Sequence, residues 1–310
     1  MAEARDLREL AKANPKVVTQ MGNQGSASAS ARRCIELIKA GALGTIREIY
    51  HWGIGVTASE GVPQGEDPVP EGFNWDFWVG PSPIRPFKKG TYHPASWRGW
   101  FDFGNGGLAD FCCHAINMPM RALDLSHPNR LVLNMENGKQ IDGKAAVEFH
   151  FPARGDLPPV VYYWQGNGKP SEEVTKSLAE VYKDKIPDGV MVLGERGVIY
   201  TSHWNTGGLI KLNDETRLTD VTRHPATKDV PQTLPRVSDH GAEWIAACRG
   251  EGRPYSNFEI GGLLTEIGLA GVVAIRAGKS LDWDGPNMRA TNAPEADKFI
   301  RTEHRSKWMA

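Results

Sequence analysis

The 310-residue sequence has little net charge and no apolar targeting segment at its start, and each shortage excludes a class of protein. Its 36 Lys and Arg residues nearly cancel 37 Asp and Glu residues, which leaves a formal net charge of -1. It therefore lacks the basic surface of a protein that binds nucleic acid or anionic membranes. No apolar run approaches the roughly 18–20 residues that span a bilayer. We expect neither nucleic acid nor a membrane among its partners.

Cysteine is also scarce, with only Cys34, Cys112, Cys113 and Cys248. Adjacent cysteines cannot pair without strain, and the others lack the spacing of a metal site. We predict free thiols and no metal. A reducing compartment, and so a cytoplasmic location, is expected. An export signal could nevertheless have been lost with a missing N-terminal domain.

Tryptophan is abundant, and seven of the ten fall between residues 50 and 205. A tryptophan on a loop often stacks against a sugar ring, although core packing is the commoner use of each single residue. Four of these seven lie within residues 57–106, a stretch rich in proline, glycine and aromatic residues that shows no sustained period. So long a loop in a compact domain is usually functional, and we interpret it as an ordered wall of an active site.

The remaining chain alternates helical and strand-like patterns without an internal repeat. Helices are predicted at 2–14, up to about 40, 107–124, 239–248 and 259–277. Short strands are predicted at 17–21, 45–52, 130–135, 145–151, 160–165, 190–193, 197–201 and 209–212. Short strands separated by turn residues favour antiparallel pairing. The pattern predicts an α+β fold in which helices cover one face of an open, mostly antiparallel sheet.

One predicted helix carries the candidate chemistry. Asp110 and His114 are four residues apart and so share a helix face. The glycine-rich stretch 102–107 precedes them and permits a tight entry into the helix. A carboxylate beside an imidazole can orient the ring and tune its pKa for general acid–base catalysis. Alone the pair is weak evidence, since helical Asp and His side chains more often cap a helix or lie on its surface.

The nine residues 92–100 strengthen this interpretation because they add hydroxyl, imidazole, guanidinium and indole groups just before the helix. Arg98 lies between Trp97 and Trp100, which suits the binding of a polyol or carboxylate. A structural salt bridge or a cation–π contact explains Arg98 equally well.

Several longer motifs resemble the bacterial Gfo/Idh/MocA oxidoreductases, particularly those found with sugar-processing enzymes. They are Thr19-Gln20-Met21-Gly22-Asn23-Gln24-Gly25, Asn74-Trp75-Asp76-Phe77-Trp78-Val79-Gly80-Pro81, the segment 92–114, Glu243-Trp244-Ile245-Ala246-Ala247-Cys248 and Ser256-Asn257-Phe258. The motifs occur in order and span essentially the whole chain.

The resemblance implies an N-terminal Rossmann domain followed by a sugar-binding α/β domain that often dimerises through its open sheet. It implies that His114 takes part in proton transfer at the oxidised hydroxyl and that Asp110 supports substrate binding. The remaining assignments are substrate contacts at Tyr92, His93, Trp97, Arg98, Trp100 and Asn117, and weak cofactor contacts at Asn23 and Gln24.

The sequence departs from the family at its start. No G-x-G-x-x-G turn follows an early strand, and the family's Glu-Lys-Pro element is absent. We expect NAD(P) for a complete family member and none bound by this chain alone. Residues 1–24 are interpreted as the last helix and strand of a Rossmann domain, and 25–310 as the substrate domain. The remnant would expose Leu7, Leu10, Ala11, Val17 and Val18 unless something covers them.

Three hypotheses remain open. The chain is the substrate half of a sugar or polyol oxidoreductase, inactive in hydride transfer as it stands. Alternatively it catalyses a redox-neutral reaction on keto-sugars, such as elimination or hydration, using Asp110 and His114. For this the only candidate extra bases are His203 and His240, both of which a structural role explains better. In the third hypothesis it is a non-catalytic subunit that binds sugar or forms dimers.

Overall fold

Alternating apolar and polar residues build one ten-stranded sheet in the computed structural model, which describes residues 1–55, 58–183 and 185–305. In spatial order the strands are β10 (Thr219–Asp220), β9 (Leu209–Leu212), β8 (Gly197–Thr201), β7 (Gly189–Gly194), β1 (Ile46–Trp52), β6 (Val160–Trp164), β5 (Val147–Phe151), β2 (Arg130–Leu133), β11 (Leu281–Asp284) and β12 (Arg289–Ala290). Every neighbouring pair is antiparallel except β1 and β6. A separate two-stranded ribbon joins β3 (Met135–Glu136) to β4 (Lys139–Gln140). The predicted α+β class is confirmed.

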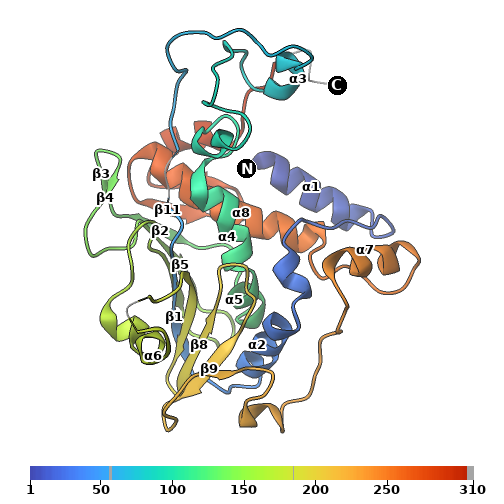
Figure 1. Cartoon of the computed structure of the whole chain (residues 1–310), viewed down its shortest axis with the longest axis vertical. Helices are drawn as coiled ribbons and strands as arrows, with labels where there is room; N and C mark the ends of the chain where they lie inside the picture. The colour runs from blue at the N-terminus through green and yellow to red at the C-terminus, as the bar shows by residue number, and fades with distance from the viewer. Residues whose placement is uncertain (56–57, 184, 306–310) are drawn as a thin grey trace.

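Most helices cover one face of this sheet (Figure 1). The helices are α1 (Ala2–Ala13), α2 (Ala29–Lys39), α3 (Trp75–Val79), α4 (Gly106–Ala115), α5 (Asn117–Ala122), α6 (Glu172–Tyr182), α7 (His240–Cys248) and α8 (Phe258–Ala277). Short 3-10 turns occur at Gln24–Ala27, Ser96–Gly99, Pro225–Thr227 and Pro294–Phe299. Polar residues cap the helices as expected, since Ser28, Asp239 and Asn257 each accept a hydrogen bond from a backbone N–H in the first turn.

The sheet has a core on each face. Residues of β5 and β6 alternate, and their buried members Phe149, Tyr162 and Trp164 lie in the main core with α2, α4, α5 and α8. On the opposite face α6 packs through Val174 and Leu178 against Trp52, Met191 and Tyr200. No pattern in the sequence predicted α6, and because α6 covers part of this face, the expectation that helices cover one face is wrong.

Part of that second face carries exposed or half-buried aromatic and acidic residues. Tyr50 and Tyr163 stack with ring centroids 4.5 Å apart, beside Glu48 and Glu148. Burial and the two carboxylates raise the pKa of Tyr163 to about 12. The predicted homo-oligomer contact through this face stays a prediction.

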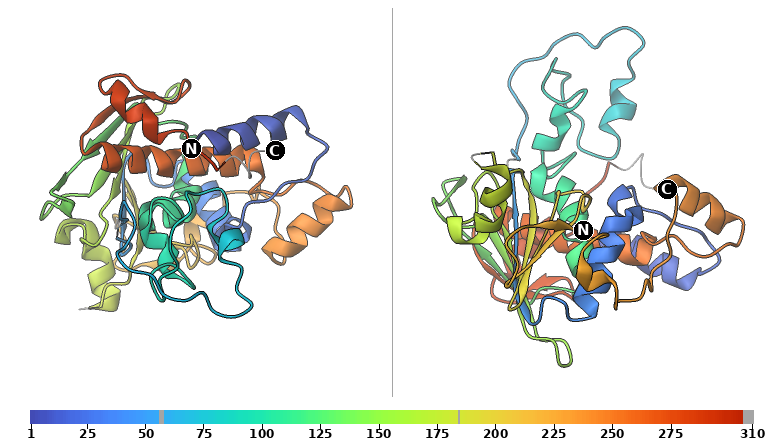
Figure 2. Two further views of the ribbon diagram at one scale, coloured as in Figure 1. Left: turned by 90° about the horizontal axis from the view of Figure 1, so that it is seen from above. Right: turned by 60° about the horizontal axis from the view of Figure 1, so that its bottom comes forward.

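Helix α8 is the central helix of the fold because its glycines allow other elements to approach closely. A Cβ on Gly262 would lie 2.6 Å from Arg8 Cβ and 3.0 Å from the Ala4 carbonyl of α1. A Cβ on Gly271 would lie 2.6 Å from Phe149 and 2.8 Å from Leu108 of α4. Figure 2 shows α1 lying along α8.

Helix α8 also corrects the expectation about apolar runs. With 20 residues it is long and apolar enough to cross a membrane by length and composition alone. It is largely buried inside the protein, as the core helix of a soluble domain would be.

Buried charge fastens α1 to α8. Glu266 is 2% exposed and accepts hydrogen bonds from Arg5 at 2.5 and 2.8 Å and from Arg8 at 3.3 Å. His127 lies 2.9 Å from the same carboxylate. Burial by itself raises the pKa of Glu266, but hydrogen bonds from Arg5 and His127 outweigh it and hold the pKa at about 2.

The N-terminal segment differs in part from the prediction. Residues 17–21 form no strand, whereas α1 forms as expected. Of the five apolar residues expected to be exposed, Leu7, Leu10 and Val17 are exposed, Val18 is half-buried and Ala11 is buried. The division at residue 24 stays a prediction, and the predicted second unit includes residues 306–310, which lie outside the described part.

Residues 58–106 of the predicted wall at 57–106 form a lobe that projects from the sheet (Figure 2), and residue 57 lies outside the described part. Its own small core contains Trp75, Val79, Phe87 and Tyr92. The lobe leads directly into α4, and α4 ends at Ala115 with Ile116 as its C-cap, so the single helix predicted over 107–124 is two helices.

Replacing Gly271 by alanine will destabilise the protein by about 1–3 kcal/mol, because the new methyl group overlaps Phe149 and Leu108. This loss exceeds the gain in helix propensity. Urea unfolding checks it, with Gly22→Ala as the control, since a Cβ there meets nothing within 4 Å. Equal stability of both variants would contradict the close packing.

The Glu266 cluster predicts acid sensitivity. Because the folded pKa is about 2 and lies below the unfolded value, the stabilisation is complete above about pH 5 and is lost as pH falls towards 2. Glu266→Gln should cost about 3 kcal/mol at pH 7 and flatten this dependence. Glu259→Gln removes the more exposed pair with Arg253 and should cost under about 1 kcal/mol. Denaturant unfolding between pH 2 and 7 measures both.

Candidate functional site

Helix α4 presents the predicted pair away from the core. Leu108 and Cys112 are fully buried on its inner side, where a Cβ on Gly268 of α8 would lie 3.2 Å from Cys112. Asp110 and His114 are only partly buried. The helical period therefore explains their exposure, because residues two positions from a buried stripe point elsewhere.

Arg98 closes one side of this pair. Its Nε donates to Asp110 Oδ2 at 2.7 Å, and its guanidinium lies 4.4 Å from the centre of the Trp97 ring. Both explanations that the sequence left open for Arg98, an ion pair and a cation–π contact, are therefore present. Because the Arg98 side chain is 49% exposed, its other N–H groups can still reach a ligand.

His114 lies among aromatic rings. Its ring centroid is 4.5 Å from Trp204 and 6.0 Å from Phe111. Burial lowers the pKa of His114, Asp110 opposes the shift, and His203 adds to it, so that the pKa lies below its ordinary value. His114 is accordingly neutral at pH 7 and able to accept a proton.

The sheet supplies a second wall, which includes His203, a residue that the sequence offered as an extra base but that a structural role explained better. The parallel pairing of β1 with β6 brings their C-terminal ends to the same end of the sheet, where antiparallel β7 begins and β8 ends. His203 and Trp204 follow β8 at this end of the sheet, and the ring of Phe111 of α4 lies 5.6 Å from His203 and 5.3 Å from Trp204. Gly25 explains how close this loop comes, since a Cβ there would overlap the Trp204 carbonyl.

The other predicted residues lie elsewhere. Tyr92 and Trp100 belong to the core of the lobe, and exposed His93 lies 5.0 Å from Phe73 of the same lobe. Asn117 is buried and accepts from Arg121 Nε at 3.0 Å. The structure thus brings together Asp110, His114, Arg98 and Trp97 but not these four; the predicted role of each in binding stays a prediction.

The two adjacent residues Asn23 and Gln24 differ in their exposure to solvent. Asn23 is 1% exposed, and neither atom of its amide has a hydrogen-bond partner. Gln24 is exposed. Asn23 is two residues from Gly25, which contacts the Trp204 loop, so it approaches the His114 side of the structure.

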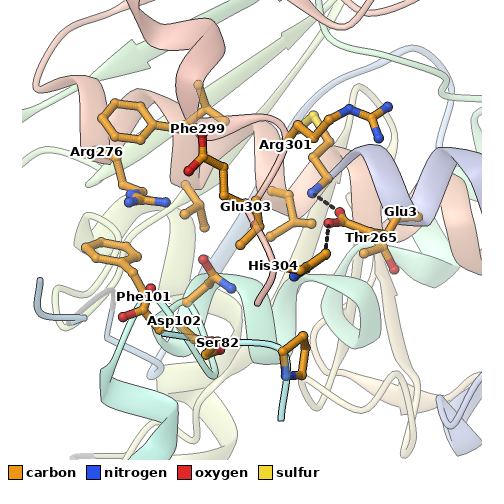
Figure 3. A pocket seen from close by; sticks show the side chains of 18 of the residues that line it. Glu3, Ser82, Phe101, Asp102, Thr265, Arg276, Phe299, Arg301, Glu303 and His304 are labelled. Carbon is orange, nitrogen blue, oxygen red and sulfur yellow. Dashed lines mark hydrogen bonds and ion pairs between the residues drawn. The ribbon is translucent and has the colours of Figure 1, made fainter. Parts of the chain in front are cut away.

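A cavity of about 940 Å³ lies next to the N-terminal end of α4, whose N-cap residue Asn105 is part of the lining (Figure 3). It is bounded by α1, α8, residues 81–83 and 101–105, and the strap 297–304. Arg276 enters it between the rings of Phe101 and Phe299, at 5.0 and 4.4 Å from their centres. None of the site residues predicted from sequence lines this cavity.

The glycine-rich stretch before α4 does not fit the pyrophosphate of a dinucleotide. A Cβ on Gly104 would lie 2.5 Å from Arg98 Cα, and one on Gly107 would lie 2.1 Å from the Gly55 carbonyl. These glycines therefore serve close packing within the protein and leave no room for a pyrophosphate against their backbone. In the same described part, no three His, Cys, Asp or Glu side chains converge as metal ligands.

With this geometry in view, the comparisons with known proteins are specific. Residues 46–147 match the oxidoreductase family, C-terminal alpha/beta domain, of the Gfo/Idh/MocA group. The resemblance to the Gfo/Idh/MocA oxidoreductases is confirmed. The matched segment begins at β1 and includes the lobe, Arg98 and all of α4. A search of curated proteins finds no match.

Two solved structures share the fold. An inositol dehydrogenase homolog from Azotobacter vinelandii, complexed with NADH and myo-inositol, is 14% identical with a TM-score of 0.51. The similarity covers 91% of this chain and 68% of that one. A levoglucosan dehydrogenase in complex with NADH and levoglucosan is 12% identical with a TM-score of 0.50, over 90% of this chain and 70% of that one. At such identities the likeness establishes the fold alone.

The coupling at His114 is directly measurable. NMR titration of the imidazole should give a pKa below about 6.5. Asp110→Asn should lower it further by removing the nearby negative charge, whereas His203→Gln should raise it. His150→Gln is the matched control, because His150 pairs with Glu148 on the opposite face of the sheet and should leave the titration of His114 unchanged. Unchanged titration in both site variants would show that the three groups are not neighbours in solution.

Proposed function

We propose that this chain is the substrate-binding and proton-transferring part of a sugar or polyol oxidoreductase. The observation that supports this most is the Asp110–His114 pair on one face of α4, with Arg98 bound to Asp110 at 2.7 Å. The confirmed resemblance covers this segment, and the two similar structures are complexes with levoglucosan and with myo-inositol.

His114 is assigned the role of general base. Oxidation of a secondary alcohol requires removal of the hydroxyl proton, and a neutral imidazole near pH 7 accepts it. Lowering of the His114 pKa by burial keeps the ring neutral, while Asp110 stabilises the imidazolium that forms. Arg98 and the Trp97 ring orient neighbouring hydroxyls, by charge-assisted hydrogen bonding and by stacking respectively.

The complete enzyme is expected to use NAD(P), as the family does. Because other parts of the protein fill the space beside Gly104 and Gly107, we propose that this chain alone binds no dinucleotide. The nucleotide would be held by a unit outside the described residues. The chain by itself would then bind substrate without transferring hydride.

Isothermal titration with myo-inositol, levoglucosan and NAD(H) tests the proposal. We expect polyol binding without nucleotide binding, and Arg98→Ala should weaken polyol binding about tenfold or more because a charged hydrogen-bond donor is lost. Arg130→Ala, which removes a similarly exposed arginine paired with Asp282 at another part of the sheet, should leave it unchanged.

Each other outcome is informative. Tight binding of NAD(H) would mean that the chain contains a nucleotide site and would contradict the division proposed. If neither Arg98→Ala nor His114→Gln affects polyol binding, the binding site does not lie at α4. This result would favour a sugar-binding subunit without catalysis.

A further inference from the structure

Two imidazoles flank the same pair of aromatic rings. His114 of α4 and His203 after β8 lie 6.0 and 5.6 Å from Phe111, measured between ring centroids. The same two histidines lie 4.5 and 6.1 Å from Trp204. They are 89 residues apart in the sequence and come near each other because this end of the sheet lies under α4.

The two rings present equivalent atoms. In both, Nδ1 is buried without a hydrogen-bond partner. Nε2 of neither ring is buried in this way, so each ring offers this nitrogen for proton transfer. Each imidazole is half-buried, so neither is a fully enclosed core residue such as His51, both of whose ring nitrogens are buried.

Each imidazole also has its own carboxylate. Asp110 favours the charged form of His114, and Asp188, which precedes β7, favours the charged form of His203. Burial acts against both and leaves the pKa of each below its ordinary value. The other titratable or charged groups facing them are His51 on β1, and Cys113 and Arg98 beside Asp110.

We propose that His203 is a second acid–base residue of this site and that, together with His114, it exchanges the proton on the carbon beside the carbonyl of a keto-sugar. This inference rests on the proposed function, because oxidation of one hydroxyl of a polyol yields a ketone beside a CH–OH carbon. A single histidine suffices for the oxidation, and the second one adds a redox-neutral reaction on its product.

The step balances without an oxidant or a reductant. One neutral imidazole takes the C–H proton, and the electron pair of that bond forms the C=C of an enediol. The carbonyl oxygen receives a proton from the other, protonated imidazole. Reversal returns a proton to carbon and restores the ketone. In deuterated water the carbon therefore acquires deuterium, and no electrons leave the substrate.

This mechanism requires one neutral and one protonated imidazole. The pair titrates with two apparent pKa values, both below about 6.5, and the rate is greatest between them. Exchange should therefore have a bell-shaped pH profile with its maximum on the acid side of pH 6.5. A site with one functional base would instead give a rate that reaches a plateau as pH rises.

The experiment incubates the chain with 2-keto-myo-inositol or L-sorbose in deuterated buffer without nucleotide, and follows the C–H signals by NMR. Exchange should exceed that in buffer alone. His203→Gln and His114→Gln should each reduce it by about 10²-fold or more, while keto-sugar binding measured by calorimetry changes only a few-fold. His150→Gln is the matched control and should exchange at the unaltered rate.

Three results would overturn the inference. Binding of the keto-sugar without exchange removes this activity and leaves the proposed oxidoreductase role intact. Exchange that survives His203→Gln but not His114→Gln makes His203 structural. Absence of binding to any polyol or keto-sugar refutes the proposed function and this inference together. Should His203→Gln fail to fold, the pH profile of the unaltered chain decides the question.

Discussion

The arrangement depends above all on how closely other elements approach α8. Glycines occupy the positions of α8 that contact α1, α4 and Phe149 of the sheet, so no side chain of α8 holds these elements apart. Any larger residue at Gly271 would separate α4 from the sheet. Since Asp110 and His114 lie on the outer side of α4, their position over the sheet edge follows from contacts on its inner side. The buried Glu266 cluster then fixes α1 on the same helix.

Two parts of the structure form the site, and only one of them is evident from the sequence. The lobe and α4 are consecutive in the chain, and they bring Arg98 against Asp110. The sheet contributes His203 and Trp204 through its strand order, because β1, β6, β7 and β8 are neighbours and each has one terminus at the same end of the sheet. The cavity of about 940 Å³ is separate from this site, and its walls come from α1, α8, the strap 297–304 and residues 81–83 and 101–105 of the lobe. Arg276, one of the cations that line it, is held between two phenylalanine rings and paired with Glu60 at 2.9 Å.

Sequence patterns predicted local structure well where the pattern was long. The strands at 46–52, 147–151 and 160–164 and the helix at 258–277 follow directly from alternation or apolar periodicity. Failures have physical causes. Residues 17–21 have strand propensity but find no partner strand, and Ile116 interrupts a helical pattern by turning the chain into α5. Helix α6 was missed because its apolar face is narrow and covers the smaller core.

The sequence by itself determined the family resemblance, the α+β class and the pairing of Asp110 with His114, because helical period alone places residues i and i+4 on one face. It also indicated Arg98, which is only twelve residues from its partner. Only the tertiary structure decided which aromatic residues belong to the site. Tyr92 and Trp100 share the motif of Arg98 yet pack into the lobe core, whereas His203 and Trp204 reach His114 from 89 and 90 residues away. Such contacts depend on strand order and helix docking, which no local pattern encodes.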